Sequence, residues 1–190
     1  MRTFLALELS DSYRAKLTQL ISELKIFDNN NIKWVVPENL HITLQFIGET
    51  KESDLPEIFD FLKELFKDKP KLQFISKNLY LAPGRDPKVI WIEMQNNNTW
   101  IINSHKKIKS FLNEKGYRFN KKPLRFHITL GRIKKRIDPD TIYKILNKKI
   151  ELLEILIEDI ALIKSTLRPQ GPIYETIANF NLKGDNDGKK

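Results

Sequence analysis

The tetrapeptide His-Ile-Thr-Leu occurs twice in this chain, at 41–44 and again at 127–130, 86 residues later. In a β-strand, alternate side chains point to opposite faces, so the histidine and threonine of each copy would project to one side and the isoleucine and leucine to the other. Each copy therefore predicts a strand with an apolar back and a front that presents an imidazole beside a hydroxyl. The four side chains on these fronts are His41, Thr43, His127 and Thr129.

The elements around the two tetrapeptides also repeat. Hydrophobic periodicity and turn signals predict strands at 3–9, 32–36, 40–47, 71–82, 88–95, 125–133, 151–164 and 173–181, and helices at 11–26, 53–68, 99–115 and 138–149. Leu5 lies 36 residues before His41, and Ile90 lies 37 before His127. Two such halves predict an α+β fold of two pseudo-symmetric lobes, with the motif strands facing each other across a central cleft.

The ends of these elements carry further signals. Ser10 or Asp11 is expected to cap the first helix, Ser53 the second, and Asp138, followed by a proline, the fourth. A turn at 82–87 separates the halves. We expect residues 1–183 to form one two-lobed domain and the polar tail 184–190 to be disordered.

Composition excludes several classes of protein. The chain has no cysteine, which rules out disulfides, zinc–thiolate sites and thiol nucleophiles, and cytoplasmic localisation is expected. No apolar stretch approaches the roughly 20 residues of a membrane span, so we expect no membrane association. The net charge of +9 is concentrated at 105–149, where 15 basic and 3 acidic residues leave a surplus of 12. Such a field favours a polyanion near His127, although solvated helix faces would give the same pattern.

Two histidines and two hydroxyls are the set that phosphodiester chemistry requires. One imidazole takes a proton from the attacking oxygen, another protonates the leaving oxygen, and the hydroxyls bind the charged phosphate oxygens. With an unperturbed pKa of about 6.5, one histidine can be neutral while its partner is a cation near neutral pH. The third histidine, His105, lies among lysines on an expected amphipathic helix and is predicted to face solvent.

Other uses of paired histidines have less support. Transition-metal sites recruit three or four ligands, and neither motif strand has a carboxylate at ligand spacing, so we expect no metal. The chain lacks a Gly-x-Ser-x-Gly elbow and a phosphate-binding glycine loop, so neither a serine triad nor a nucleotide cofactor is expected.

The sequence resembles the two-histidine (2H) phosphoesterases, and within them the RNA 2',3'-cyclic phosphodiesterases, also called 2'-5' RNA ligase-like proteins. The likeness covers nearly the whole chain. The matching segments are Arg2-Thr3-Phe4-Leu5-Ala6, Trp34-Val35, Pro37-Glu38-Asn39-Leu40 with the first motif, Phe46-Ile47-Gly48-Glu49, Phe126 with the second motif and Gly131-Arg132, Ser165-Thr166-Leu167, and Gly171-Pro172-Ile173-Tyr174.

This resemblance implies antiparallel sheets lining the cleft and metal-free hydrolysis of an RNA 2',3'-cyclic phosphate to a 2'-phosphomonoester. It also implies that His41 is the proton donor, that His127 is the proton acceptor, and that Thr43 and Thr129 bind the phosphate. Arg132 matches a substrate-binding position, but strict alternation turns it away from His127 unless a bulge at Gly131 re-aims it. The partner would be an RNA with a cyclic phosphate end, and we expect a monomer.

Several alternatives stay open at this point. Tyr174 could contact the nucleotide or belong to the core, and Trp34 could stack on a base, although a buried role is favoured. The same acid–base pair could serve 2'-5' RNA ligation, or hydrolysis of small cyclic nucleotides or 2'-5' oligonucleotides. A noncatalytic RNA-binding protein is the alternative outside enzymes, and it predicts salt-dependent RNA affinity that is independent of both motif histidines.

Overall fold

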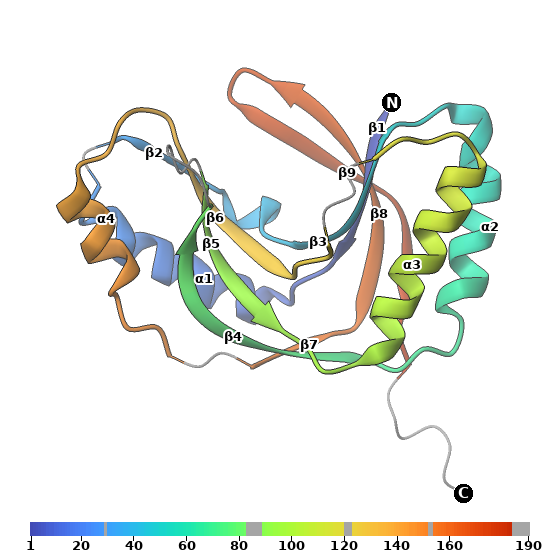
Figure 1. The fold of residues 1–190 in the computed structure, drawn as a ribbon, viewed down its shortest axis with the longest axis horizontal. Helices are drawn as coiled ribbons and strands as arrows, with labels where there is room; N and C mark the ends of the chain where they lie inside the picture. Colours follow the sequence, from blue (N-terminus) through green and yellow to red (C-terminus); the bar gives the residue numbers. More distant parts are fainter. Residues whose placement is uncertain (29, 83–88, 120–122, 152–153, 184–190) are drawn as a thin grey trace, which may run out of the picture.

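The computed structural model describes residues 1–28, 30–82, 89–119, 123–151 and 154–183. Its elements are β1 (Arg2–Leu7), α1 (Asp11–Lys25), β2 (Ile32–Trp34), β3 (Ile42–Glu49), α2 (Leu55–Phe66), β4 (Leu72–Leu81), β5 (Val89–Gln95), α3 (Thr99–Glu114), β6 (His127–Ile133), α4 (Pro139–Leu146), β7 (Glu154–Ile157), β8 (Asp159–Arg168) and β9 (Gly171–Asn181) (Figure 1). Short 3-10 helices at Pro37–Asn39 and Glu52–Asp54 precede β3 and α2.

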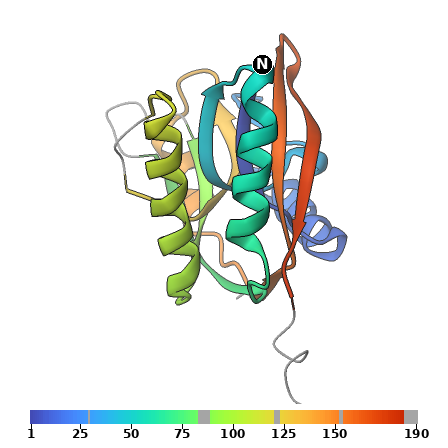
Figure 2. The ribbon, with the colours of Figure 1, turned by 90° about the vertical axis from the view of Figure 1, so that its right-hand side faces the viewer.

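The strands form one curled antiparallel sheet. Its order is β7-β4-β5-β6-β3-β1-β8-β9, and β2 pairs with β6 beside this path. Figure 1 shows β4, β5 and β6 on one side of the molecule and β1, β8 and β9 on the other. Helices α2 and α3 lie side by side (Figure 2). Phe61 of α2 and Phe111 of α3 stack between them, with their ring centroids 4.0 Å apart. The predicted α+β class with two antiparallel lobes is confirmed, and both lobes belong to one continuous sheet.

The two halves of the chain exchange strands. Strand β4, which ends the first half, pairs with β5, which opens the second; β8, near the end of the second half, pairs with β1, which opens the first. The two motif strands pair with each other between these sets, through Ile42 opposite Ile128. These isoleucines hold the same position in each tetrapeptide, so the pseudo-twofold relation of the halves passes through this pair.

The sheet separates two apolar clusters. The larger cluster lies under the helices and includes Leu40, Ile42, Leu44 and their counterparts in the second half, all almost without solvent exposure. A small cluster on the other face consists of Phe4, Ala6, Ala161 and Ile163, with Tyr174 packed against it. The apolar backs of the motif strands are therefore buried, as predicted. No helix in the described part of the chain is long and apolar enough to cross a membrane.

Two sequence predictions about element ends were wrong. The strand expected at 151–164 is two strands, since β7 pairs with β4 and β8 pairs with β1, and the chain must change direction at Glu158 to reach both. Ser53 does not cap α2: it lies in a 3-10 helix, and Asp54 holds the cap position without a side-chain capping bond. Residues 83–87 of the expected turn and the expected disordered tail at 184–190 lie outside the described residues.

The other two caps are as predicted. The Tyr13 backbone N–H donates to Ser10 Oγ at 3.4 Å, and the Thr141 N–H donates to an Asp138 carboxylate oxygen at 2.9 Å. Pro139 follows Asp138 at the start of α4. These bonds satisfy backbone donors that a helix cannot pair internally.

The prediction that His105 faces solvent is wrong. It is only 8% exposed, and its Nε2–H donates to Gln45 Oε1 on β3 at 2.9 Å. The neighbouring lysines suggested a solvated position, but Ile101, Ile108 and Leu112 share a helix face with His105 because they are spaced by three and four residues. Burial lowers the pKa of His105 to about 4.

This pKa predicts that His105 makes the protein sensitive to acid. An unfolded chain binds a proton at the ordinary histidine pKa of about 6.5, whereas the folded protein resists protonation until about pH 4, so stability falls as the pH drops between these values. In His105→Gln, the loss of unfolding free energy between pH 7 and pH 5 should be smaller by up to about 2 kcal/mol. Urea unfolding at both pH values measures this difference, and equal losses in the two proteins would contradict the prediction.

Candidate active site

The two motif histidines are held in the same way at the starts of β3 and β6. His41 Nδ1 lies 2.8 Å from the Asn39 carbonyl oxygen, and His127 Nδ1 lies 2.8 Å from the Arg125 carbonyl oxygen. Because a carbonyl oxygen can only accept a hydrogen bond, Nδ1 carries the proton in both rings. The Nε2 atom of each histidine is therefore left to exchange protons with a ligand.

The pairing of β3 with β6 brings the two histidine–threonine units together. In an antiparallel pair the partner number falls by one as the residue number rises by one, so extending the register from Ile42 and Ile128 places Thr43 directly opposite His127 and His41 directly opposite Thr129. His41 Nε2 also lies 3.0 Å from Thr43 Oγ1, and in the neutral ring it accepts from that hydroxyl. The structure therefore gathers all four predicted side chains of the polar fronts in one place.

Matching bulges interrupt both motif strands. Residue Leu44 is skipped in the β1–β3 register, and Leu130 is skipped in the β5–β6 register. An extra residue reverses the alternation that follows it. Phe46 and Arg132, each five residues after its motif histidine, are consequently exposed, although strict alternation would bury them.

The bulge answers the question that the sequence left about Arg132. Directly opposite residues in the β5–β6 ladder are Trp91 and Thr129, and then Val89 and Arg132, so Arg132 returns to the face of Thr129. Its positive charge lowers the pKa of both His41 and His127, which places it near both rings. Gly131 is needed here because a Cβ would lie 2.7 Å from a side-chain carbon of Ile32.

Tyr174 and Trp34 occupy different surroundings. The Tyr174 ring packs on Phe4 at 5.1 Å and meets the His41 ring edge-on at 5.5 Å, and burial raises the pKa of its hydroxyl. It therefore belongs to the small apolar cluster and also borders the site. Trp34 packs over Gly131 and its indole N–H donates to an Asp28 carboxylate oxygen at 3.2 Å, which fits the buried role expected for it.

Sequence reasoning missed two aromatic neighbours of the histidines. The Trp91 ring lies 4.9 Å from the His127 ring, and the Phe4 ring lies 5.0 Å from the His41 ring. Both residues come from strands that pair with the motif strands. Strand register, which local sequence does not reveal, decides these contacts.

The surroundings of both histidines disfavour the charged ring. Burial lowers the pKa of His41 to about 4, against the opposing effect of the hydrogen bond to Asn39; the charges of Arg14 and Arg132, and that of His127 when it is protonated, lower it further. The pKa of His127 is also lowered, chiefly by burial. Both rings are thus neutral at neutral pH in the free protein. A phosphate bound beside them would raise both pKa values, because its negative charge stabilises the imidazolium form.

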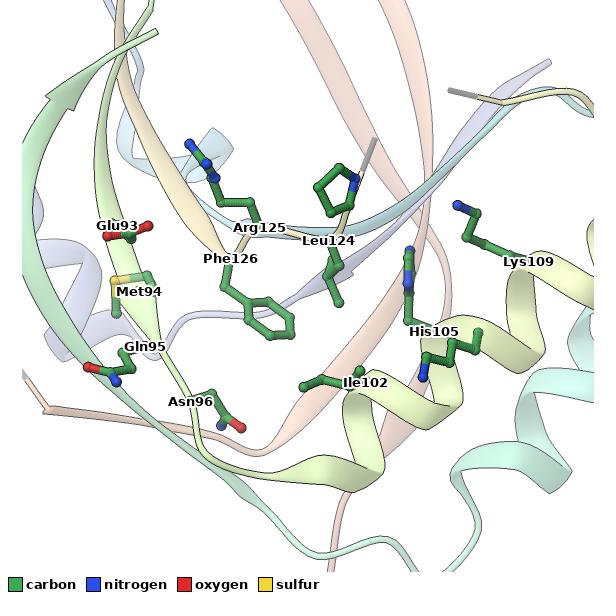
Figure 3. A pocket seen from close by; sticks show the side chains of 12 residues that line it. Glu93, Met94, Gln95, Asn96, Ile102, His105, Lys109, Leu124, Arg125 and Phe126 are labelled. Carbon is green, nitrogen blue, oxygen red and sulfur yellow. The ribbon is translucent and has the colours of Figure 1, made fainter. Parts of the chain in front are cut away.

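Two cavities lie near the motif strands, and only the first is lined by residues of the site. One of about 690 Å³ opens beside His41 and Tyr174, with Glu8 and Arg14 in its wall. The other, of about 610 Å³, lies between α3 and residues 123–126 (Figure 3). In Figure 3, Phe126 points into this cavity whereas Arg125 points away from it. Within the described ranges there is no group of three or more His, Cys, Asp or Glu residues that could hold a metal ion.

The lysines that the basic segment at 105–149 places on helices α3 and α4 are not gathered around His127. Helices α3 and α4, which carry many of its lysines, lie at opposite ends of the molecule (Figure 1). Some of these lysines are paired with acidic residues, including Lys115 with Glu57 and Lys148 with Glu23. For α3 and α4, the expectation that the basic segment surrounds His127 is therefore wrong, because the fold separates helices that are close in sequence.

The position of Arg132 can be tested through the histidines. Arg132→Gln removes a positive charge that acts on both rings, so the pKa of His41 and that of His127 should both rise. Imidazole resonances followed by NMR during a pH titration measure the two values. Arg136→Gln, which removes an exposed charge beyond the end of β6, is the control and should leave both unchanged. A rise at only one histidine would place Arg132 away from the shared site.

Comparisons with known proteins agree with this repeated architecture. Residues 7–91 and 92–174 each match the family described as LigT like Phosphoesterase. An RNA 2',3'-cyclic phosphodiesterase of Archaeoglobus fulgidus is 34% identical over 95% of this chain and 99% of its own length. The corresponding protein of Thermotoga maritima is 28% identical over 97% of both chains.

Solved structures give the same result for the fold. A crystal structure from Thermus thermophilus superposes with a TM-score of 0.79 at 26% identity, covering 97% of this chain and 100% of that one. LigT of E. coli in complex with 3'-AMP has a TM-score of 0.76 at 18% identity, covering 95% of this chain and 97% of its own. With both halves matched and relatives aligned over nearly their full length, the chain belongs to the LigT-like family of two-histidine phosphoesterases.

Proposed function

We propose that this protein hydrolyses the 2',3'-cyclic phosphate at the end of an RNA to a 2'-phosphomonoester, without a metal ion. The observation that carries the proposal is the pairing of two equivalent histidine–threonine units across Ile42 and Ile128, each with its Nδ1 bound to a backbone carbonyl so that Nε2 is the nitrogen that can exchange a proton with the substrate. Relatives of similar length are named as RNA 2',3'-cyclic phosphodiesterases, which supports the choice of substrate.

The reaction divides the two proton transfers between the histidines. His127 Nε2 takes a proton from water as the water oxygen bonds to phosphorus. The bond from phosphorus to the 3' oxygen breaks, and His41 Nε2 supplies the proton that makes the 3'-hydroxyl. Afterwards His127 carries a proton and His41 lacks one, so exchange with solvent restores the starting state.

Threonines and arginine would stabilise the charge on the phosphate. Thr43 and Thr129 donate to the non-bridging oxygens, where charge increases in the transition state. The guanidinium of Arg132 adds a positive charge on the same face and Tyr174 borders the nucleotide. Because His41 has a pKa of about 4 in the free protein, its role as acid depends on the bound phosphate raising that value.

The remaining parts of the proposal concern the protein as a whole. Residues 1–183 act as one two-lobed domain, because the continuous sheet makes each lobe depend on the other. We place the protein in the cytoplasm, in keeping with a chain that has no cysteine, and expect it to be a monomer.

The direct test uses a short RNA that ends in a 2',3'-cyclic phosphate, incubated with the protein in the presence of EDTA. Mass spectrometry should show the gain of one water, and chromatography should identify the 2'-phosphate rather than the 3'-phosphate. Small cyclic nucleotides and linear 2'-5' oligonucleotides, assayed in parallel, show whether RNA is the preferred substrate. Persistence of the ring, or activity that disappears with EDTA, would contradict the proposal.

Substitution of the motif residues tests the mechanism. His41→Ala and His127→Ala should each lower kcat by about 100 to 10,000-fold because each removes a proton-transfer group. Thr43→Ala and Thr129→Ala should each cost roughly 3 kcal/mol of transition-state stabilisation, or about 100-fold. His105→Gln is the matched control, since this third histidine lies on the helix side of the sheet, and it should retain activity. A noncatalytic RNA-binding protein would instead show unchanged RNA affinity and no turnover in any of these proteins.

A further inference from the structure

Arg14, the fourth residue of α1, connects this helix to the segment that carries His41. Its Nη1 atom donates to the carbonyl oxygens of Pro37 at 3.1 Å, Glu38 at 3.3 Å and Leu40 at 2.8 Å. Its Nε–H donates to the Leu9 carbonyl at 3.1 Å, and Nη2 pairs with the Glu8 carboxylate. One planar guanidinium thus fixes the end of β1 relative to the residues before β3.

These bonds surround the peptide group that orients His41. Glu38 and Leu40 flank Asn39, whose carbonyl accepts the proton on His41 Nδ1. The Pro37 carbonyl already accepts from the Leu40 N–H within the 3-10 turn, whereas the Glu38 and Leu40 carbonyls lie at the end of this turn, and Arg14 supplies a side-chain donor to all three. The side chain of Arg14 is only 18% exposed, so water competes little for these bonds.

Among the described residues of the second half, no side chain is equivalent to this arginine. Counted from the start of each helix, the residue of α3 that corresponds to Arg14 is Ile102, which is apolar and 39% exposed. Residues 123–126 form no helix, and among the described residues only His127 donates a side-chain hydrogen bond to one of their carbonyls. In both histidines Nδ1–H therefore donates to a backbone carbonyl, but only the carbonyl that binds His41 belongs to a segment held by an arginine.

We propose that Arg14 is a positioning residue for His41, which fixes the Asn39 carbonyl so that the ring keeps its proton on Nδ1 and directs Nε2 at the phosphate. The kinetic consequence rests on the proposed function, whereas the effect on the ring does not. The preorganised ring is the acid, the group that must meet the departing 3' oxygen. Displacement of a reacting group by about 1 Å can cost 100-fold in rate.

Arg14 also acts on His41 through its charge, and the two effects can be separated. The groups that face His41 are Glu8 and Arg14 on one side and Tyr174, His127 and Arg132 on the others. Arg14→Lys retains a positive charge but loses the planar fork, whereas Arg14→Gln loses both. The pKa of His41 should therefore rise in Arg14→Gln and change less in Arg14→Lys, because the arginine charge lowers it.

The kinetic experiment compares these two variants with Lys16→Gln, which removes an exposed charge from the same helix. Both Arg14 variants should lose about 10 to 100-fold in kcat on the cyclic-phosphate RNA, with little change in KM, and Lys16→Gln should match the wild type. Urea unfolding of each protein shows whether it is folded under assay conditions. Wild-type kcat in both Arg14 variants would overturn the proposal.

The NMR experiment reads the rings directly and needs no substrate. Nitrogen-15 shifts distinguish the protonated from the unprotonated ring nitrogen. In the wild type both histidines should be Nδ1–H tautomers above their pKa values, and in the Arg14 variants only His41 should become a mixture. An unchanged His41 tautomer, or an equal change at His127, would overturn the proposal. If the wild type opens no cyclic phosphate, the proposed function fails, and the ring tautomers still decide the role of Arg14.

Discussion

The antiparallel pairing of β3 with β6 at Ile42 and Ile128 is the interaction on which the rest of the site depends. It joins equivalent positions of two similar halves, so the histidine and threonine side chains of one strand are repeated on the other strand, which runs in the opposite direction. The exchange of β4 and β8 between the halves holds this pair at the centre of one sheet. A single ladder contact thus converts two separate tetrapeptides into one constellation of two imidazoles and two hydroxyls.

The chemistry follows from what lies behind and beside this pair. Buried apolar side chains fix the back of each motif strand, and a backbone carbonyl fixes each ring on the front. Partial burial keeps both histidines neutral until an anion arrives, which couples the readiness of the acid to the presence of substrate. The matching bulges then make the two sides unequal, since they expose Phe46 in one strand and Arg132 in the other.

The sequence alone identified the features that depend on short-range pattern. The repeat, the parity of His41 with Thr43 and the caps at Ser10 and Asp138 all follow from local periodicity. The direction of the Arg132 side chain does not follow from local periodicity, because one extra residue at Leu130 reverses the alternation of the strand without a distinctive sequence signal. The prediction that His105 is exposed was wrong because local charge says little about which helix face packs on the sheet. The prediction of a basic surface around His127 was wrong for α3 and α4 because the fold separates basic residues that are close in sequence. Contacts such as that of Arg14 with 37–40 depend on tertiary placement.

The most direct test of a single shared phosphate site is an NMR titration of the imidazole nitrogens with adenosine 2'-monophosphate, the mononucleotide form of the proposed product. If both motifs bind one phosphate, the resonances of His41 and His127 will move together with the same dissociation constant, and both pKa values will rise on saturation, while His105 stays unchanged. A response from only one of the two motif histidines, or two different dissociation constants, would contradict the account.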